Sequence, residues 1–247
     1  MTGRDGAVTG TQPAQPDGAP SRSATVLAAA HATPGFLDQR EGMALFAAAE
    51  VAAQRGLGPL VEIGAYLGRS TLYLAAGLIA ALEHGAPPSI LLSIDHHRGS
   101  EEMQAGWEHH DATLVDPATG RMDSLPRFRA NLWRAGAEDI VAAVVGDSAR
   151  VAAALTGPVG MVFIDGGHGA NVAWADYRGW TPRLAPGGLL AIHDVFPDPA
   201  DGGRPPYECY CAALDSGEFE ELEDARTLSL RVLTRRRVPR APQRASR

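Results

Sequence analysis

The sequence has no lysine, only two cysteines and no long apolar run. All 22 basic residues are therefore arginines, which we attribute to the base composition of the genome rather than to a binding device. Cys209 and Cys211 are two positions apart, where a disulfide would be strained, so we expect a reducing compartment. No stretch approaches the run of about 20 apolar residues that spans a bilayer, and the N-terminus lacks the pattern of a signal peptide. We therefore predict a cytoplasmic protein without a membrane partner.

An excess of positive charge is also missing. The formal net charge is −7 and the pI about 5.6, which argues against nucleic acid as a partner and favours small-molecule substrates. The 247 residues, 45% of them hydrophobic, are enough for one sizeable core. We expect a disordered arm over residues 1–24, one catalytic domain over 25–234 and a basic, disordered tail over 235–247.

Between the two ends, short apolar runs alternate with helical patterns. This alternation predicts an α/β fold of the doubly wound, Rossmann-like type, a mostly parallel sheet with helices on both faces. The expected strands are Leu60–Ile63, Ile90–Ile94, Val141–Val145, Met161–Ile164 and Leu189–Ile192, with a further late strand at Ser229–Leu233. The expected helices are Gln39–Gln54, Ser70–Leu82, Leu125–Ala135, Ser148–Leu155 and Asn171–Leu184.

The first expected strand leads into a helix through a turn that contains Gly64 and Gly68. Ligands of open α/β sheets bind at the carboxyl ends of the strands, so this turn predicts a nucleotide-like cofactor. Asp95 follows the second strand about thirty residues later, where its carboxylate can accept hydrogen bonds from two ribose hydroxyls. The incomplete glycine fingerprint argues against a dinucleotide, and the missing Gly-Lys-Ser/Thr argues against a P-loop.

Polar residues also follow the later strands. Asp147 is placed either to accept a hydrogen bond from an adenine amino group or to cap the next helix, and the two roles are compatible. Asp165, His193 and Asp194 end two strands and offer oxygen and nitrogen ligands to a divalent ion, Mg²⁺ in the first place and Mn²⁺ in the second. The alternative is that these residues merely end strands and cap helices.

A general base is needed to remove a proton from a substrate hydroxyl. His168, close to Asp165 in the sequence, is the preferred candidate, and Asp165 itself is either a metal ligand or a base. The long connection from Asp95 to Pro126 is a candidate lid, and its His97, together with the histidines at 109 and 110, is the alternative source of the base. A solvated loop histidine is the simpler interpretation of each.

From about residue 35 to 234 these motifs resemble the class I S-adenosylmethionine-dependent methyltransferases, specifically the metal-dependent sugar and natural-product O-methyltransferases. The stretches Ile94–Glu102, Gly106–Asp111 and Asp198–Gly203 look like the mycobacterial mannosyl 1-O-methyltransferases of methylmannose polysaccharide synthesis. The resemblance implies a seven-stranded sheet and a homodimer. It implies that the cofactor site is lined by Glu62, Gly64, Tyr66, Ser70, Asp95 and Asp147, beside Gly68 and Asp165. It places Asp165, His193 and Asp194 where related enzymes hold Mg²⁺, although those enzymes usually have an acidic residue at the position of His193.

The expected activity is thus transfer of a methyl group from S-adenosylmethionine to a hydroxyl of a sugar or related polyol, the 1-OH of a mannoside included. Two other functions remain open on the same architecture, because a fold does not determine chemistry. One is an oxidoreductase with an NAD-type cofactor, and the other is a catalytically silent assembly protein that binds an adenosyl group.

Overall fold

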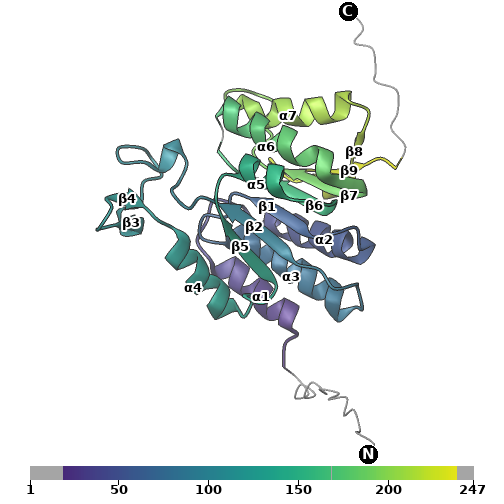
Figure 1. The fold of residues 1–247 in the computed structure, drawn as a ribbon, viewed down its shortest axis with the longest axis horizontal. Coiled ribbons are helices and arrows are strands. Elements are labelled where there is room, and N and C mark those ends of the chain that lie inside the picture. The colour runs from purple at the N-terminus through teal and green to yellow at the C-terminus, as the bar shows by residue number, and fades with distance from the viewer. Residues whose placement is uncertain (1–18, 168, 238–247) are drawn as a thin grey trace, which may run out of the picture.

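The computed structural model describes residues 19–167 and 169–237, which form one seven-stranded sheet between two layers of helices (Figure 1). The strand order is β5-β2-β1-β6-β7-β9-β8. The strands are β1 (Leu60–Ile63), β2 (Leu91–Asp95), β5 (Val141–Val145), β6 (Val159–Ile164), β7 (Leu184–Ile192), β8 (Phe219–Glu221) and β9 (Arg231–Arg235). Strands β1, β2, β5, β6 and β7 are parallel, whereas β9 is antiparallel to both of its neighbours. The Rossmann-like, mostly parallel fold predicted from the sequence is confirmed.

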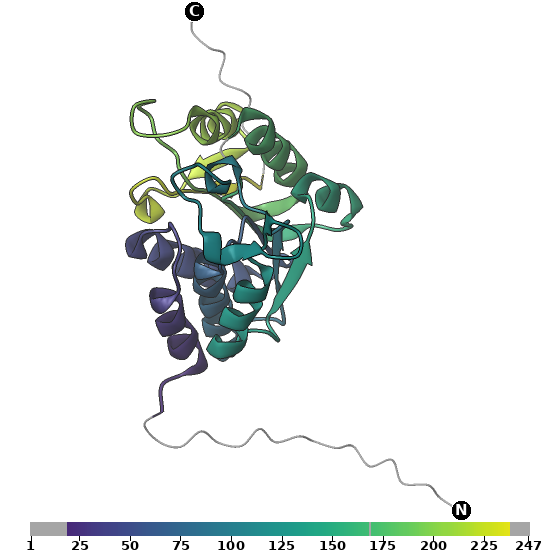
Figure 2. The ribbon, with the colours of Figure 1, turned by 90° about the vertical axis from the view of Figure 1, so that its left-hand side faces the viewer.

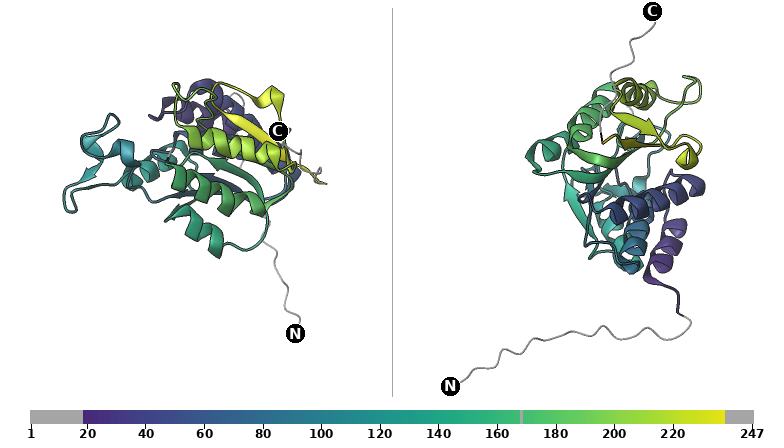
Figure 3. Two further views of the ribbon diagram at one scale, coloured as in Figure 1. Left: turned by 90° about the horizontal axis from the view of Figure 1, so that it is seen from above. Right: turned by 90° about the vertical axis from the view of Figure 1, so that its right-hand side faces the viewer.

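The helices cover both faces of this sheet, as Figure 1 and the two views of Figure 3 show. One layer contains α1 (Arg22–Ala32), α2 (Gln39–Arg55), α3 (Arg69–Glu83) and α4 (Leu125–Ala135). The other contains α5 (Ser148–Ala154), α6 (Ala170–Trp180) and α7 (Arg204–Asp215). Each layer has its own core cluster against the sheet.

The central strands are buried on both faces because successive side chains point to opposite sides. In β6, Met161 and Phe163 belong to the core of the α1–α4 layer, whereas Val162 and Ile164 belong to the core of the α5–α7 layer. A strand whose side chains are buried in both cores has an uninterrupted apolar sequence. That apolar run is the pattern from which the strand was predicted.

The N-terminal arm is shorter than predicted. Helix α1 begins at Arg22, capped by the Ser21 side chain, so residues 22–24 are helical rather than disordered. The helix is stable here because Val26 and Ala30 are buried in the core that α3 shares. Residues 1–18 of the expected arm lie outside the described residues.

The C-terminal boundary also differs by one residue. Strand β9 extends to Arg235, whose guanidinium forms an ion pair with Glu218 at 3.0 Å, so the expected tail over 235–247 overlaps the sheet. Residues 238–247 of the tail are outside the described residues. Within the described residues no helix is long and apolar enough to cross a membrane.

The long connection after β2 has little regular structure. It contains two short 3₁₀ turns and a small antiparallel pair, β3 (Val115–Asp116) and β4 (Arg121–Met122), and it extends beyond the sheet (Figures 1 and 2). A small apolar cluster of Leu67, Leu114 and Met122 holds it against the turn that follows β1. The connection therefore lies next to the carboxyl ends of the strands, where the sequence predicted a lid.

Candidate active site

The turn from β1 to α3 lies directly against the end of β6. Gly64 has a φ of +88°, and a Cβ atom at this position would lie 2.0 Å from the backbone oxygen of Asp165, so only glycine fits. Gly68, with a φ of +91°, is the N-cap residue of α3. Gly64 thus brings the backbone of the predicted cofactor turn next to Asp165.

Asp95 holds this turn from the neighbouring strand β2. Its Oδ2 accepts hydrogen bonds from the backbone N–H groups of Ala65 and Tyr66, each at 2.9 Å, and its Oδ1 accepts one from His97 N–H at 2.7 Å. The side chain is 15% exposed. A carboxylate oxygen accepts more than one hydrogen bond, so Oδ1 retains acceptor capacity for a ribose hydroxyl.

Beneath the turn, Glu62 is fully buried and accepts three hydroxyl hydrogen bonds. Ser70 donates to Oε1 at 2.6 Å, and Thr71 and Ser93 donate to Oε2 at 2.6 and 2.7 Å. Burial raises the pKa of Glu62 to about 7, although the three hydroxyls act in the opposite direction. Glu62 and Ser70 therefore support the turn from inside, and direct contact of either with a cofactor stays a prediction.

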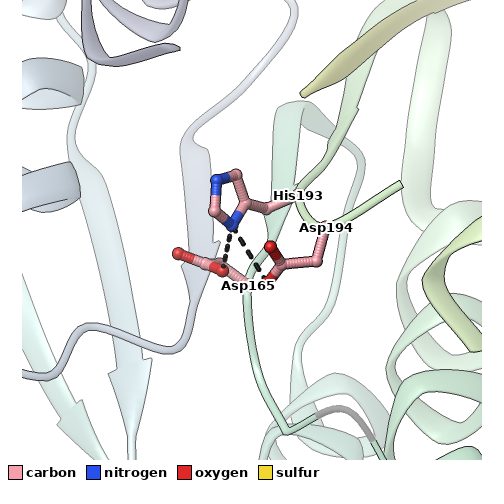
Figure 4. A group of neighbouring side chains, drawn as sticks. All are labelled: Asp165, His193 and Asp194. Atoms are coloured by element: carbon pink, nitrogen blue, oxygen red, sulfur yellow. Dashed lines mark ion pairs between the residues drawn. The ribbon is translucent and has the colours of Figure 1, made fainter. Parts of the chain in front are cut away.

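Asp165, His193 and Asp194 meet at the ends of the adjacent strands β6 and β7, as Figure 4 shows. His193 Nδ1 lies 3.0 Å from Asp165 Oδ1 and 3.2 Å from Asp194 Oδ2. The histidine is buried, and both aspartates are partly exposed. Asp194 has a φ of +56°, a conformation that costs free energy in a residue other than glycine and is concentrated at functional sites.

The far nitrogen of the same ring contacts a third carboxylate. His193 Nε2 lies 3.0 Å from Oε2 of Glu41, a residue of α2 that is 3% exposed. Burial lowers the pKa of His193, but the charge of Asp165 and the contacts with Asp165, Asp194 and Glu41 outweigh it and raise the pKa far above its usual range. Burial raises the pKa of Glu41, but the contacts with His193 and Ser229 lower it overall.

The donor set fits a divalent ion. One ligand atom from each of Asp165, His193 and Asp194 lies within 4.8 Å of the others. Nδ1 of His193 is buried and makes no well-aligned hydrogen bond within the described part of the chain, although two carboxylate oxygens lie close to it. An imidazole nitrogen and two carboxylate oxygens are ligand types that divalent metal ions accept. The ion would have to displace the proton on Nδ1.

Two predicted residues, His97 and Asp147, lie apart from this cluster. His97 is 2% exposed; its Nδ1 lies 2.8 Å from Ser124 Oγ, and its ring packs on Phe128. Burial lowers the pKa of His97, and a buried ring that anchors the long connection does not fit the predicted role of base. Asp147 caps α5 by accepting from Arg150 N–H at 2.9 Å, which confirms the capping role and leaves adenine contact a prediction. His168 lies outside the described residues.

An aromatic group connects the long connection to the turn. The Phe36 ring lies 5.4 Å from that of Tyr66 and 4.9 Å from that of His109. Phe36 is 57% exposed and belongs to the segment between α1 and α2. Tyr66, a predicted cofactor residue, has a φ of +47° and therefore presents its ring from a strained turn toward this group.

Sequence reasoning missed Glu41 and Ser93. Glu41 lies on the buried face of its helix, four and seven positions before Leu45 and Ala48, which are also buried. A carboxylate on a face that is otherwise apolar was the available signal, because such a group needs a buried partner. Nothing in the sequence indicated that the partner is His193.

Residues 61–195 match a protein-family model described as a methyltransferase domain. Solved structures with the same fold include the O-methyltransferase NovP, with a TM-score of 0.59, 18% identity, and coverage of 81% of both chains. The O-methyltransferase TomG from Streptomyces achromogenes, crystallised with SAM, has a TM-score of 0.53 and 17% identity, covering 88% of this chain and 90% of that chain. An O-methyltransferase from Bacillus cereus in complex with SAH has a TM-score of 0.55 and 16% identity, covering 89% and 92%. At these identities the similarity concerns the fold.

Proposed function

Since the chain belongs to the methyltransferase family, whose model matches more than half of it, we propose that it is an S-adenosylmethionine-dependent O-methyltransferase assisted by a divalent metal ion. One observation carries the proposal: a carboxylate–imidazole–carboxylate cluster lies at the strand ends directly beside the turn that contains Gly64. The close backbone approach of the cofactor turn to the metal-ligand cluster would place a bound cofactor next to a bound ion. Methyl transfer needs this proximity, because the methyl donor and the acceptor oxygen must be aligned. The solved structures named above with SAM and SAH support the choice of cofactor.

The contribution of the protein to such a reaction is mainly positioning. When bound, S-adenosylmethionine supplies an electrophilic methyl group, and the metal ion lowers the pKa of the acceptor hydroxyl. Asp95 fixes the turn through three backbone hydrogen bonds and offers its remaining acceptor capacity to the ribose. Asp165, His193 and Asp194 would hold the ion. His168 is the proposed base that takes the hydroxyl proton onto a ring nitrogen.

For the acceptor we propose a hydroxyl of a saccharide or related polyol, with the 1-OH of a mannoside as the first candidate. The resemblance of Ile94–Glu102, Gly106–Asp111 and Asp198–Gly203 to mannosyl 1-O-methyltransferases supports this. Trp107, 54% exposed in the long connection, offers an apolar ring surface of the kind that sugar C–H faces pack on. From the same resemblance we propose a homodimer, which light scattering tests. We also propose a cytoplasmic location, which cell fractionation tests.

The first experiment is calorimetric titration of the full chain with S-adenosylhomocysteine, with Mn²⁺, with Mg²⁺ and without metal, followed by NAD. Selective binding of adenosylhomocysteine supports the proposal. Binding of NAD instead of adenosylhomocysteine would favour the alternative, an oxidoreductase. Turnover is then measured by mass spectrometry on mannosides, other polyols and catechols. Adenosylhomocysteine binding without turnover of any acceptor class would favour the silent adenosyl-binding protein.

A further inference from the structure

The ring nitrogen of His193 that points away from Asp165 and Asp194 contacts Glu41, a buried carboxylate of α2. We propose that Glu41 is the positioning residue that makes His193 a metal ligand, and that the resulting nitrogen-containing site prefers Mn²⁺ to Mg²⁺. The inference rests on the metal-assisted part of the proposed function. It concerns a contact between α2 and the end of β7, residues that are 152 positions apart.

The carboxylate of Glu41 is fixed by the backbone of the segment that leads into β9. Its Oε1 accepts hydrogen bonds from Ser229 N–H and Ser229 Oγ, each at 2.9 Å, and from Leu230 N–H at 3.1 Å. Three donors on one oxygen leave the group no freedom to rotate. The other oxygen, Oε2, is therefore held toward His193 Nε2 at 3.0 Å.

This fixed acceptor determines how the imidazole is presented. A carboxylate accepts hydrogen bonds and has none to donate, so the nitrogen that faces Oε2 carries a hydrogen. Loss of the proton on Nδ1, which metal binding requires, would then leave the lone pair on that nitrogen. Nδ1 faces Asp165 Oδ1 at 3.0 Å and Asp194 Oδ2 at 3.2 Å, so the lone pair is directed at the place that the two carboxylates enclose. Histidine ligands of metals commonly donate their second N–H to a carboxylate in this way.

The nitrogen ligand bears on which metal is bound. Mg²⁺ prefers an all-oxygen environment, whereas Mn²⁺, as a transition-metal ion, accepts an imidazole nitrogen together with carboxylates more readily. A site of one imidazole nitrogen and two carboxylates reverses the order expected from the sequence, in which Mg²⁺ came first. The preference between the two ions therefore follows from His193 as a ligand, which Glu41 positions.

Glu41→Gln separates this role from a purely structural one. The amide oxygen can still accept from Ser229 and Leu230, which leaves the amide NH₂ facing His193 Nε2. The ring must then offer its lone pair at Nε2 and carry its hydrogen on Nδ1, where it opposes a metal ion. The matched control is Ser229→Ala, which removes one hydrogen bond to the same carboxylate and leaves the contact with His193 in place.

The measurement is Mn²⁺ and Mg²⁺ binding to the full chain by calorimetry, with the electron paramagnetic resonance of free Mn²⁺ as the second readout. The wild type is expected to bind Mn²⁺ more tightly than Mg²⁺. Glu41→Gln should weaken Mn²⁺ binding roughly 10- to 100-fold, the range for losing such an outer partner, while Ser229→Ala stays within about twofold of the wild type. Adding H193D to E41Q should restore binding and shift the preference toward Mg²⁺.

Any other outcome contradicts one specific part of the proposal. If the wild type binds Mn²⁺ and Glu41→Gln binds it equally well, Glu41 does not position His193, and the proposed function stands. If the wild type prefers Mg²⁺, the argument from the nitrogen ligand is wrong. If neither ion binds, His193 is part of a permanent ion cluster with its three carboxylates, and both the inference and the metal-assisted reaction fail. Adenosylhomocysteine binding is measured on the same samples and reports on the methyltransferase assignment independently.

Discussion

The hydroxyl of Ser93 donates a hydrogen bond to Oε2 of Glu62 at 2.7 Å, and the two residues are directly opposite each other on β2 and β1. The contact is buried in the middle of the sheet. Ser70 and Thr71, in the first turn of α3, donate to the same carboxyl group. Glu62 thus joins two strands and a helix beneath the cofactor turn, where an apolar side chain would only fill space.

The first prediction follows from the pKa of Glu62, which burial raises to about 7 from an ordinary value of 4.5. Because the pKa of Glu62 is higher in the folded than in the unfolded protein, the protonated carboxyl stabilises the folded state. This stabilisation is complete below about pH 4.5 and is lost as the pH rises through 7. The amide of Glu62→Gln does not titrate, so the variant should keep the same stability where the wild type loses it. Its free energy of unfolding relative to that of the wild type should therefore rise by about 3 kcal/mol between pH 4.5 and 8. Urea unfolding across that range measures it.

The control is Glu138→Gln, the same change at an exposed position. Its stability should follow the wild type in parallel at every pH. A parallel curve for Glu62→Gln as well would show that the buried carboxyl does not change its protonation in this range.

The second prediction concerns Asp95. Asp95→Ala removes the acceptor of three backbone N–H groups around the cofactor turn and should weaken binding of S-adenosylhomocysteine about 5- to 150-fold, which corresponds to about 1–3 kcal/mol. Calorimetry gives the affinity. Asp116→Ala, which removes the side-chain acceptor of the Ala118 N–H, should bind as the wild type does. Equal affinity of both variants would remove Asp95 from the cofactor site.

The third prediction concerns Asp165. Asp165→Asn changes the side-chain volume little but replaces a charged oxygen ligand, so kcat should fall at least about 10- to 100-fold while the thermal transition persists. Steady-state kinetics and circular dichroism test the two parts. The control is Asp139→Asn, an exposed aspartate paired with Arg22, which should retain full activity. Full activity of a folded Asp165→Asn protein would refute the site.

The fourth prediction concerns the aromatic contacts of Phe36, which link the long connection to the cofactor turn. Phe36→Ala removes the ring that contacts both Tyr66 and His109, so this segment should open more often. Cleavage by trypsin after Arg121, which is exposed, should become roughly 2- to 10-fold faster, since one aromatic pair contributes about 0.5–1.5 kcal/mol. Trp133→Ala, which removes a more exposed aromatic ring from α4, is the control. Cleavage rates that do not differ would mean that Phe36 does not hold the connection.

The sequence predicted the elements that carry the site because their signals are local. The strands Leu60–Ile63 and Val141–Val145 and the helix Leu125–Ala135 have the predicted bounds, since each apolar run ends at a glycine or lies next to a proline. The α6 helix ends at Trp180 rather than Leu184, because a 3₁₀ turn around Pro182 follows it.

Two helices were missed. The α1 segment is rich in alanine and has few large apolar residues, and it is stable because it packs on α3. The α7 helix begins at Arg204, and Pro205 and Pro206 lie in its first turn, where proline is tolerated. The contact between Glu41 and His193 depends on the tertiary fold, so no local pattern could have predicted it.

The close approach of Gly64 to the backbone oxygen of Asp165 has a consequence for protein engineering. A side chain at position 64 would separate the first strand from the fourth parallel one, so both must come from the same parent in a chimeric enzyme. The segment over residues 96–124 is less restricted, because beyond its two ends it is held by a small apolar cluster and by the ring contact between Phe36 and His109. Recombination between family members with crossovers at these two ends should therefore exchange this segment while the close approach of Gly64 to Asp165 is preserved.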